Sequence, residues 1–556
     1  MANLSNTRHL FAFTSPRSIE KIIPEIRLLY NNFEGKIWTT DIQAKFYDDL
    51  FDSDFFKGES KAQDKELAAR DRITRAPKAL GFVDLNPTIQ LTEAGKQLVT
   101  EKRTYETITK QLLKFQLPSP YHTDKNDRFF VRPYLEFLRL VKTVESLSKS
   151  EVALFFLQLT RIDKFDEVVS KILKFREDRK NWNGNRKLFV EEYFKQEIAK
   201  IFEQEISTND IDTRESKDNS FAKFVKTKKQ NMGDYADAFI RYVRATQLIT
   251  FQTKTYRVII APSKIAEVDF ILKNIDRKPI IFKNKEEFKD YLFSGFNIKL
   301  LYDDKKLLIN NLRKLNTEFN ENQSIEELKD LFELTEKKIK NEKIEETTLQ
   351  LKNYKEFEDV LDVFYKIQKR EVPDPPLYLE WNVWRAMTMI NYAIKVNGNF
   401  TIDTDGVPLN TATGNKADIE IEYDTFKMIV EVTLSSGNTQ FNMEGESVAR
   451  HFGMMQKSSI KPVFCFFIAP KISDGALGHF FNLNRFNTKV YGGKTRIIPL
   501  NIIDFVEFLR TAKNKNFSNS QSLHSYLEMI VLKNQVAEDE VIWFNTIKKS
   551  VENWIS

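Results

Sequence analysis

Two carboxylates in the last third of the sequence stand where charged groups are costly. Glu431 interrupts the apolar run at residues 428–432, and Asp418 directly precedes residues 419–423, in which apolar and charged side chains alternate. The alternation and the apolar run predict two strands, joined by a turn at residues 424–425. A carboxylate in a buried strand needs a partner or a metal ion. We therefore expect Asp418 and Glu431 to meet at one end of a hairpin.

Oxygen ligands of this kind suit Mg²⁺, which neutralises charge and activates water in phosphodiester hydrolysis. Two further carboxylates lie on predicted helices before and after the hairpin. Glu444 shares a helix face with Val448 and His451 by its spacing. Glu380 opens an aromatic, apolar helix, where it is either another ligand or a residue favoured by the helix dipole.

Cysteine and histidine chemistry is not favoured by the sequence. The single Cys465 lies in the apolar run at residues 462–470, which predicts a buried strand and a structural thiol. The five histidines are scattered, with no pair at metal-ligand spacing and no second cysteine to complete a zinc site. Any bound metal must therefore be held by oxygen atoms.

Charge is distributed unevenly along the chain. Of its 85 Lys and Arg and 79 Asp and Glu, residues 1–280 hold 49 and 40, so this part carries +9 and the remainder −3. Such an excess is compatible with a polyanionic partner. No apolar run is long enough to span a membrane, and residues 1–14 lack the features of a signal peptide, so we expect a cytoplasmic protein.

The basic part contains two segments in which a predicted helix precedes a short hairpin. Residues 66–80 lead into residues 81–98, and residues 234–248 lead into residues 249–260. Each segment resembles a winged helix, whose helix could project long donors into a DNA groove. The alternative is that their cations are ordinary solvated charges. The candidate DNA contacts are Arg17, Arg70, Arg72, Arg75, Lys78, Lys223, Lys226, Lys228, Lys229, Arg241 and Arg244.

A helical connector separates the two ends of the chain. Residues 296–372 contain neither Gly nor Pro, and their apolar residues recur every three to four positions. This spacing predicts two amphipathic helices joined near residues 320–324. Pro373, Pro375 and Pro376 then end the pattern, so a C-terminal domain begins near Leu377.

Several motifs together resemble the AlwI/BstNBI group of type IIS restriction and nicking endonucleases, with a cleavage domain of the PD-(D/E)XK type. The C-terminal motifs are Glu380-Trp381, Gly414-Asn415 with Asp418, Glu431-Val432-Thr433, Gln440 with Glu444 and Glu446, Arg450-His451 and residues 495–500. The N-terminal ones are residues 15–25, Arg70-Asp71-Arg72 and residues 91–96. The resemblance covers nearly the whole chain and is weakest in the connector.

The resemblance implies a multidomain α+β protein. It would have winged-helix-like recognition domains at residues 1–145 and 146–285, a helical linker at 286–376 and an α/β cleavage domain with a central mixed sheet at 377–556. It implies that Glu380, Asp418, Glu431 and Glu444 form a catalytic Mg²⁺ site. It also implies cleavage of duplex DNA a few nucleotides outside a short asymmetric site. The resemblance further implies that a cognate DNA methyltransferase is a functional partner and that the protein is located in a bacterial cytoplasm.

One departure from the wider superfamily concerns the attacking water. Thr433 stands where a catalytic lysine is usual, so the water must be oriented and deprotonated by another group, for which Glu444 is the candidate. Gln440 and Arg450 are candidates for positioning phosphate or a carboxylate, and structural roles fit them equally.

Three alternatives remain open. The chain could be a strand-specific nicking enzyme of the same group, a non-catalytic winged-helix DNA-binding regulator, or a structure-selective nuclease such as a junction resolvase. An enzyme that cuts both strands needs two cleavage domains, from a transient homodimer or from a separate small subunit. The recognition sequence and the cut offset do not follow from residue types, because base contacts also depend on docking geometry and water.

Overall fold

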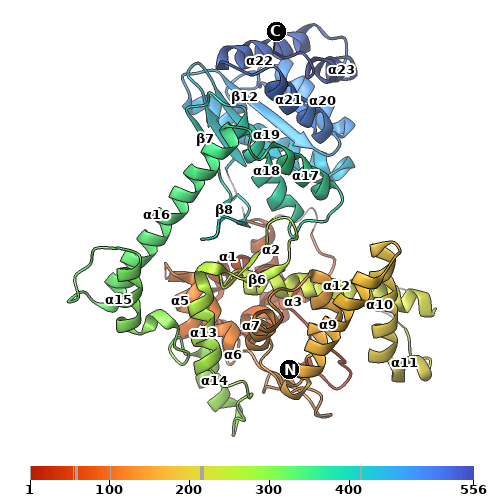
Figure 1. The fold of residues 1–556 in the computed structure, drawn as a ribbon, viewed down its shortest axis with the longest axis vertical. Coiled ribbons are helices and arrows are strands. Elements are labelled where there is room, and N and C mark those ends of the chain that lie inside the picture. The colour runs from red at the N-terminus through yellow and green to blue at the C-terminus, as the bar shows by residue number, and fades with distance from the viewer. Residues whose placement is uncertain are drawn as a thin grey trace. The chain divides into compact units, whose positions relative to one another are not determined.

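The computed structural model describes residues 2–53, 55–56, 61–100, 102–212, 218, 220–412 and 416–555. It divides into two compact units, Met1–Thr335 and Glu336–Ser556 (Figure 1). None of the helices in the described residues is long and apolar enough to cross a membrane.

The first unit is built almost entirely of helices. Its α-helices are α1 (Ile22–Phe33), α2 (Thr40–Phe51), α3 (Lys65–Ile73), α4 (Ala76–Ala79), α5 (Glu93–Thr100), α6 (Thr104–Lys114), α7 (Pro133–Val144), α8 (Lys149–Leu154), α9 (Phe165–Asn181), α10 (Arg186–Ile201), α11 (Glu203–Ser207), α12 (Phe221–Arg244), α13 (Ile265–Asn274), α14 (Lys285–Phe293) and α15 (Lys305–Lys314). The next helix, α16 (Ile325–Lys352), runs past the boundary between the units.

The strands of the first unit form three two-stranded pairs. They are β1 (Ala2–Asn3) with β4 (His122–Thr123), β2 (Val83–Asp84) with β3 (Gln90–Leu91), and β5 (Ile249–Phe251) with β6 (Val258–Ile260). The last two pairs are antiparallel and follow α4 and α12, so the helix-then-hairpin order is present twice.

The first of these helices differs from its prediction. The expected single helix at residues 66–80 is broken between Ile73 and Ala76 into α3 and α4. Pro77 explains the break, because it lacks an N–H for the helix ladder and its ring clashes with the preceding turn. The prediction of one continuous helix was wrong in this respect.

The turn after β3 explains the Leu-Thr-x-x-Gly sequence at residues 91–95. The Thr92 hydroxyl accepts the N–H of Gly95 at 3.0 Å and donates to the carbonyl of Gly81 at 2.5 Å. A Cβ at Gly95 would lie only 1.9 Å from the carbonyl oxygen of Phe82. Only glycine allows α5 to pack this closely against β2.

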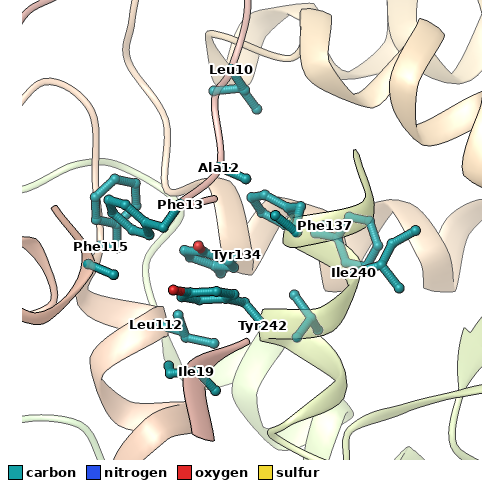
Figure 2. Packing of buried hydrophobic residues seen from close by; sticks show 14 of the residues in the cluster. Leu10, Ala12, Phe13, Ile19, Leu112, Phe115, Tyr134, Phe137, Ile240 and Tyr242 are labelled. Atoms are coloured by element: carbon teal, nitrogen blue, oxygen red, sulfur yellow. The ribbon is translucent and has the colours of Figure 1, made fainter. Parts of the chain in front are cut away.

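The N-terminal segment at residues 10–13 lies in the buried core of the first unit. Phe13 lies 5.4 Å from Phe115 and 5.9 Å from Tyr242, measured between ring centroids. Figure 2 shows Leu10, Ala12 and Phe13 entering among side chains of α6, α7 and α12. One cluster of buried side chains extends from Leu4 to Leu300, so the two predicted recognition domains share a core.

The predicted pair of connector helices is confirmed as α15 and α16. Leu308 and Leu312 of α15 pack against Leu328 and Phe332 of α16. Lys329 of α16 also donates to two carboxylates of the first unit, Glu106 at 2.9 Å and Asp303 at 2.6 Å. The start of α16 is therefore fixed to the first unit.

The second unit contains a five-stranded sheet flanked by helices and a separate two-stranded pair, β8 with β9. The helices are α17 (Phe357–Gln368), α18 (Pro375–Met389), α19 (Gly437–Ser458), α20 (Asp474–Arg485), α21 (Ile502–Asn514), α22 (Ser520–Val536) and α23 (Glu540–Ser550). The strands are β7 (Lys395–Gly398), β8 (Thr401–Ile402), β9 (Pro408–Asn410), β10 (Ile419–Glu422), β11 (Lys427–Val432), β12 (Val463–Ala469) and β13 (Ile497–Asn501).

The five-stranded sheet has the order β13-β12-β11-β10-β7. The strands β7, β10 and β11 are antiparallel neighbours, whereas β11, β12 and β13 run parallel. Neighbouring residues of β12 face opposite helices: Phe466 contacts Phe508 of α21, and Phe467 contacts Phe480 of α20. The predicted central mixed sheet, and the buried strand that contains Cys465, are confirmed.

The helix α17 packs on α18 within the second unit. Arg385 of α18 donates to Glu356 and Asp359 at 2.6 Å each, and Asn382 donates to the carbonyl of Val360 at 2.9 Å. These bonds are part of the support under α18, which carries Glu380.

Candidate active site and DNA-binding surface

The hairpin of β10 and β11 brings the two principal carboxylates together. Ile419 pairs with Val430, so the register extended by one residue places Asp418 opposite Glu431. The Asp418 carboxylate accepts the N–H of Val432 at 2.8 Å. This bond holds Asp418 against the strand that carries Glu431, as the sequence predicts.

Glu431 is 7% exposed and lies in the middle of the sheet. It is in register with Phe467, so it faces the side of the sheet covered by α20. Its Oε1 lies 2.8 Å from Nδ1 of His451, which comes from α19. A buried carboxylate is costly without a partner, and His451 supplies one. Sequence reasoning placed His451 near the site but gave it no role.

The two carboxylates affect the pKa of the neighbouring Cys465. Burial raises the pKa of its thiol well above the usual range, and the Glu431 and Asp418 carboxylates raise it further. A thiol held in its neutral form is a poor nucleophile. The expected structural role for Cys465 agrees with this environment.

The other two predicted carboxylates lie on flanking helices. Glu380 is buried in α18, and its Oε2 accepts the N–H of Ala412 at 2.9 Å. Glu444 is half-buried on α19, seven residues before His451, which places both on one helix face. Glu380 and Glu444 thus lie on two different helices beside the sheet.

The metal-site prediction has only partial geometric support. Within residues 2–412 and 416–555, apart from the short gaps given above, no group of three or more His, Cys, Asp or Glu side chains is arranged to hold a metal ion. Gly414 and Asn415, two members of the predicted motif, lie outside the described residues. Of the four predicted metal ligands, the two that the structure places opposite each other are Asp418 and Glu431.

The remaining candidate positions in this unit make local contacts. The Gln440 amide donates to the carbonyls of Ser435 and Lys471 and accepts the N–H of Ser473, so it ties α19 to the chain before α20. Arg450 lies 3.3 Å from Glu446 in an exposed pair. Thr433 is buried, and its hydroxyl accepts the N–H of Ser435. The contacts of Gln440 are those of a structural residue.

A cavity of about 740 Å³ in the first unit brings together three of the predicted cations from two parts of the sequence. Arg75 and Lys78 from the first helix-hairpin segment line it, and so does Lys228 from the basic run in α12. None of the described residues that line the cavity is acidic. Arg8 and Lys285, which sequence reasoning missed, also line its wall. The cavity is therefore a cationic surface formed by segments far apart in the sequence.

Aromatic and histidine rings complete the wall of the cavity. The ammonium of Lys228 lies 4.7 Å from the ring centroid of Phe202. Burial lowers the pKa of His122 to about 4, so this ring is neutral near pH 7. Burial also lowers the pKa of His9, and Lys228 lowers it further. The positive charge of the wall therefore comes from lysine and arginine rather than from histidine.

Most of the other predicted DNA contacts are engaged within the protein. Four of these cations pair with carboxylates, and the pairs are Arg17 with Asp234, Arg72 with Glu25, Lys229 with Glu191 and Arg241 with Asp237. Arg244 is 6% exposed and donates to the carbonyl of Ile249. Arg70 bonds to the carbonyl of Glu66, and Lys226 is exposed. Their contacts with DNA, and those of Lys223, stay predictions.

A family model described as AlwI restriction endonuclease matches residues 78–508. No curated protein matches the chain. The match spans part of the first unit, the connector and most of the second unit.

Two solved structures are similar to parts of the chain. The small subunit (R.BspD6I2) of the heterodimeric restriction endonuclease R.BspD6I is 25% identical, with a TM-score of 0.31, over 35% of this chain and 98% of that one. The BpuJ1 endonuclease binding domain, in complex with pyrene- and phenanthrene-modified DNA, is 15% identical, with a TM-score of 0.33, over 52% of this chain and 96% of that one. At these TM-scores neither likeness establishes a common fold.

Proposed function

The chain belongs to the AlwI restriction endonuclease family, and on that premise we propose that it is a Mg²⁺-dependent type IIS enzyme. It binds a short asymmetric site in duplex DNA through residues 1–335 and hydrolyses phosphodiester bonds a few nucleotides outside that site. The family is one of site-specific deoxyribonucleases, so a non-catalytic regulator is the weaker reading.

The observation that carries the proposal is the placement of Asp418 opposite the buried Glu431 at the end of a hairpin. The donor set fits Mg²⁺, which binds through one or two carboxylates and keeps several of its waters. Asp418 and Glu431 would hold the ion, and Glu380 and Glu444 would complete its surroundings. When bound, the ion neutralises charge on the phosphate and lowers the pKa of a water molecule.

Other residues of the chain would orient the two carboxylates and accept the proton of the attacking water. The bond from Val432 fixes the direction of the Asp418 carboxylate, and His451 fixes that of Glu431. Thr433 carries no charge, so it cannot take the role of the lysine that is usual at this position. Glu444, on the same helix face as His451, accepts the proton of the attacking water in our proposal.

Recognition is assigned to the cationic cavity and to the two winged-helix-like segments beside it. Lysine and arginine side chains attract the DNA backbone, and the long arginine donors can read base edges. Arg75 and Lys78 lie at α4 in the first segment and line the cavity, and Arg75 also forms an exposed ion pair with Asp71 at 2.8 Å. They are the best placed of the predicted contacts.

The decisive experiment is run-off sequencing of cleaved plasmid fragments, which reports the site, the offset and the number of strands cut. Asp418→Asn and Glu431→Gln should each lower the cleavage rate by roughly 10³-fold or more, because a metal centre supplies several kcal/mol of transition-state stabilisation. Glu422→Gln is the matched control. This carboxylate lies at the other end of β10, pairs with Lys461 and should leave cleavage unchanged.

Three results would contradict the proposal. Cleavage by Asp418→Asn and Glu431→Gln at the wild-type rate would show that the active site is elsewhere. Binding of DNA without cleavage across a series of divalent metals would favour the regulator. Equal cutting of unrelated sequences that share a branched shape would favour a junction resolvase.

A further inference from the structure

The short helix α14 is held firmly against the first helix-hairpin segment. Gly81 has a φ of +78°, and a Cβ there would lie 2.5 Å from Cγ of Leu292 in α14. The amide of Gln111 donates to the carbonyls of Leu80 and Leu292, at 2.7 Å each. Lys289 of α14 forms an ion pair with Asp84 of β2 at 2.5 Å. A helix from the predicted linker therefore contributes to the surface that follows α4.

Tyr121 lies where α4 and α14 meet. Its ring packs edge-on against Phe288 of α14, with the centroids 5.1 Å apart, and the residue is 7% exposed. Its hydroxyl oxygen is buried and has no hydrogen-bond partner in the described part of the chain. Burial, and to a lesser extent Asp84, raises the pKa of this hydroxyl, so it stays protonated. Tyr121 lines the cavity, but its buried hydroxyl is not accessible to a ligand there.

Two ammonium groups lie over the Tyr121 ring. Lys78 Nζ is 5.3 Å from the ring centroid, and Lys285 Nζ is 6.0 Å from it. Both residues line the cavity, and neither forms an ion pair with any carboxylate among the described residues. Lys289, the third lysine nearby, already has Asp84 as its partner.

The nearby positive charges affect the pKa of Lys78. Burial lowers the pKa of its ammonium, and repulsion from Lys285 and Lys289 lowers it further, whereas Asp84 acts in the opposite direction. Two cations that approach each other without a carboxylate between them are stabilised when an anion is shared between them. The oxygens of a phosphate can accept hydrogen bonds from two ammonium groups at once.

We propose that Lys78 and Lys285, whose ammonium groups lie over the Tyr121 ring, form a binding site for one phosphate of the DNA backbone. The proposal rests on the proposed function and goes beyond it, because it brings α14 into DNA binding and assigns Lys285 a specific contact. Lysine acts on phosphate as a point charge and reads no base, so this site positions the duplex and does not select its sequence.

The test measures DNA affinity against salt concentration for a cognate and an unrelated duplex, without a cleavage-supporting metal. Lys285→Ala should lower the slope of log K against log salt by about 1 and weaken both duplexes by the same factor. Tyr121→Phe should leave both the affinity and the slope unchanged, because it keeps the ring and removes only a buried hydroxyl. Lys289→Ala is the matched control and should keep the wild-type slope, because Lys289 is paired with Asp84.

Two results would overturn the phosphate site alone. One is a wild-type slope for Lys285→Ala. The other is an equal loss of slope in Lys285→Ala and Lys289→Ala, which would mark a general effect of charge. Lys285→Arg, which keeps the charge, should restore the slope if Lys285→Ala acts through its missing cation.

Further experiments distinguish a site for DNA phosphate from a site for free phosphate and from a failure of the proposed function. If inorganic phosphate raises the melting temperature of the wild type but not of Lys285→Ala, while the two DNA slopes are equal, the site takes free phosphate and the proposal is overturned. Wild-type protein that neither binds nor cuts duplex DNA would overturn the proposed function and this site together.

Discussion

His451 and Glu431 form a hydrogen-bonded pair in which Nδ1 lies 2.8 Å from Oε1. The pair joins α19 to the centre of the sheet, and both side chains are nearly buried. A ring in this position fixes the direction in which the carboxylate presents its second oxygen. Such partners of metal-binding groups commonly affect metal affinity as strongly as activity.

Replacing His451 by Ala should therefore raise the Mg²⁺ concentration needed for half-maximal cleavage and lower activity by about 10- to 100-fold. A titration of cleavage rate against Mg²⁺ checks this, since a merely structural loss would lower the rate without shifting the midpoint. His524→Gln is the control, because His524 stacks on Phe426 at the turn of the hairpin. An unshifted midpoint for His451→Ala would remove the positioning role.

Gly95→Ala should destabilise the first unit by about 1–3 kcal/mol, the usual cost of inserting atoms into a packed site. The added Cβ would meet the carbonyl oxygen of Phe82 at 1.9 Å, and backbone cannot move aside as a flexible side chain can. Thermal unfolding monitored by circular dichroism measures the loss. Gly233→Ala in α12 is the control: nothing lies within 4 Å of its Cβ position, so the better helix former should stabilise by up to about 1 kcal/mol.

Lys114 should make stability depend on pH above neutrality. Burial lowers its pKa to about 7, and Lys110 contributes to the shift while Glu93 opposes it. Between pH 7 and about 10 the unfolded chain keeps a proton that the folded chain has released. Stability from this group therefore rises with pH across that window and is flat below it.

Denaturant unfolding of the wild type and of Lys114→Met, at pH 7 and pH 9, measures this contribution. The variant should lack the part of the rise that belongs to Lys114, although it also loses the bond from Lys114 to Gln111. That loss affects both pH values, so the comparison is made on the change with pH. Equal changes in the two proteins would show that Lys114 is charged throughout.

Cleavage of supercoiled plasmid should produce the open-circular form first, because one active site cuts one strand at a time. If a second copy of the chain then supplies the other site, the rate of linear DNA formation should rise with protein concentration. Gel analysis of a time course at several concentrations checks this. Linear DNA that appears without an open-circular intermediate would contradict sequential cutting, and open-circular DNA as the final product would indicate a nicking enzyme.

The hairpin of the candidate active site could be predicted because its signals are local. The alternation around Ile421 and the apolar run around Glu431 specify two strands and their register within a few residues. The break before α4 was missed, although Pro77 is a local signal, because the hydrophobic spacing of residues 66–80 suits one helix.

Other features depended on long-range packing and could not be predicted. Lys285 joins Lys78 only because α14 packs on the turn at Gly81, and helical spacing predicts a buried face without naming its partner. In the same way, the spacing placed His451 beside Glu444, while its bond to Glu431 depends on how α19 docks on the sheet.

The buried N-terminal segment has a consequence for the order in which the protein matures on the ribosome. Phe13 is synthesised long before Tyr242, the α12 residue against which its ring packs, and Leu10 and Ala12 enter the same cluster. These apolar side chains therefore lack part of their core until α12 has emerged from the ribosome. The segment is thus made early but completes these contacts only after α12 has been made.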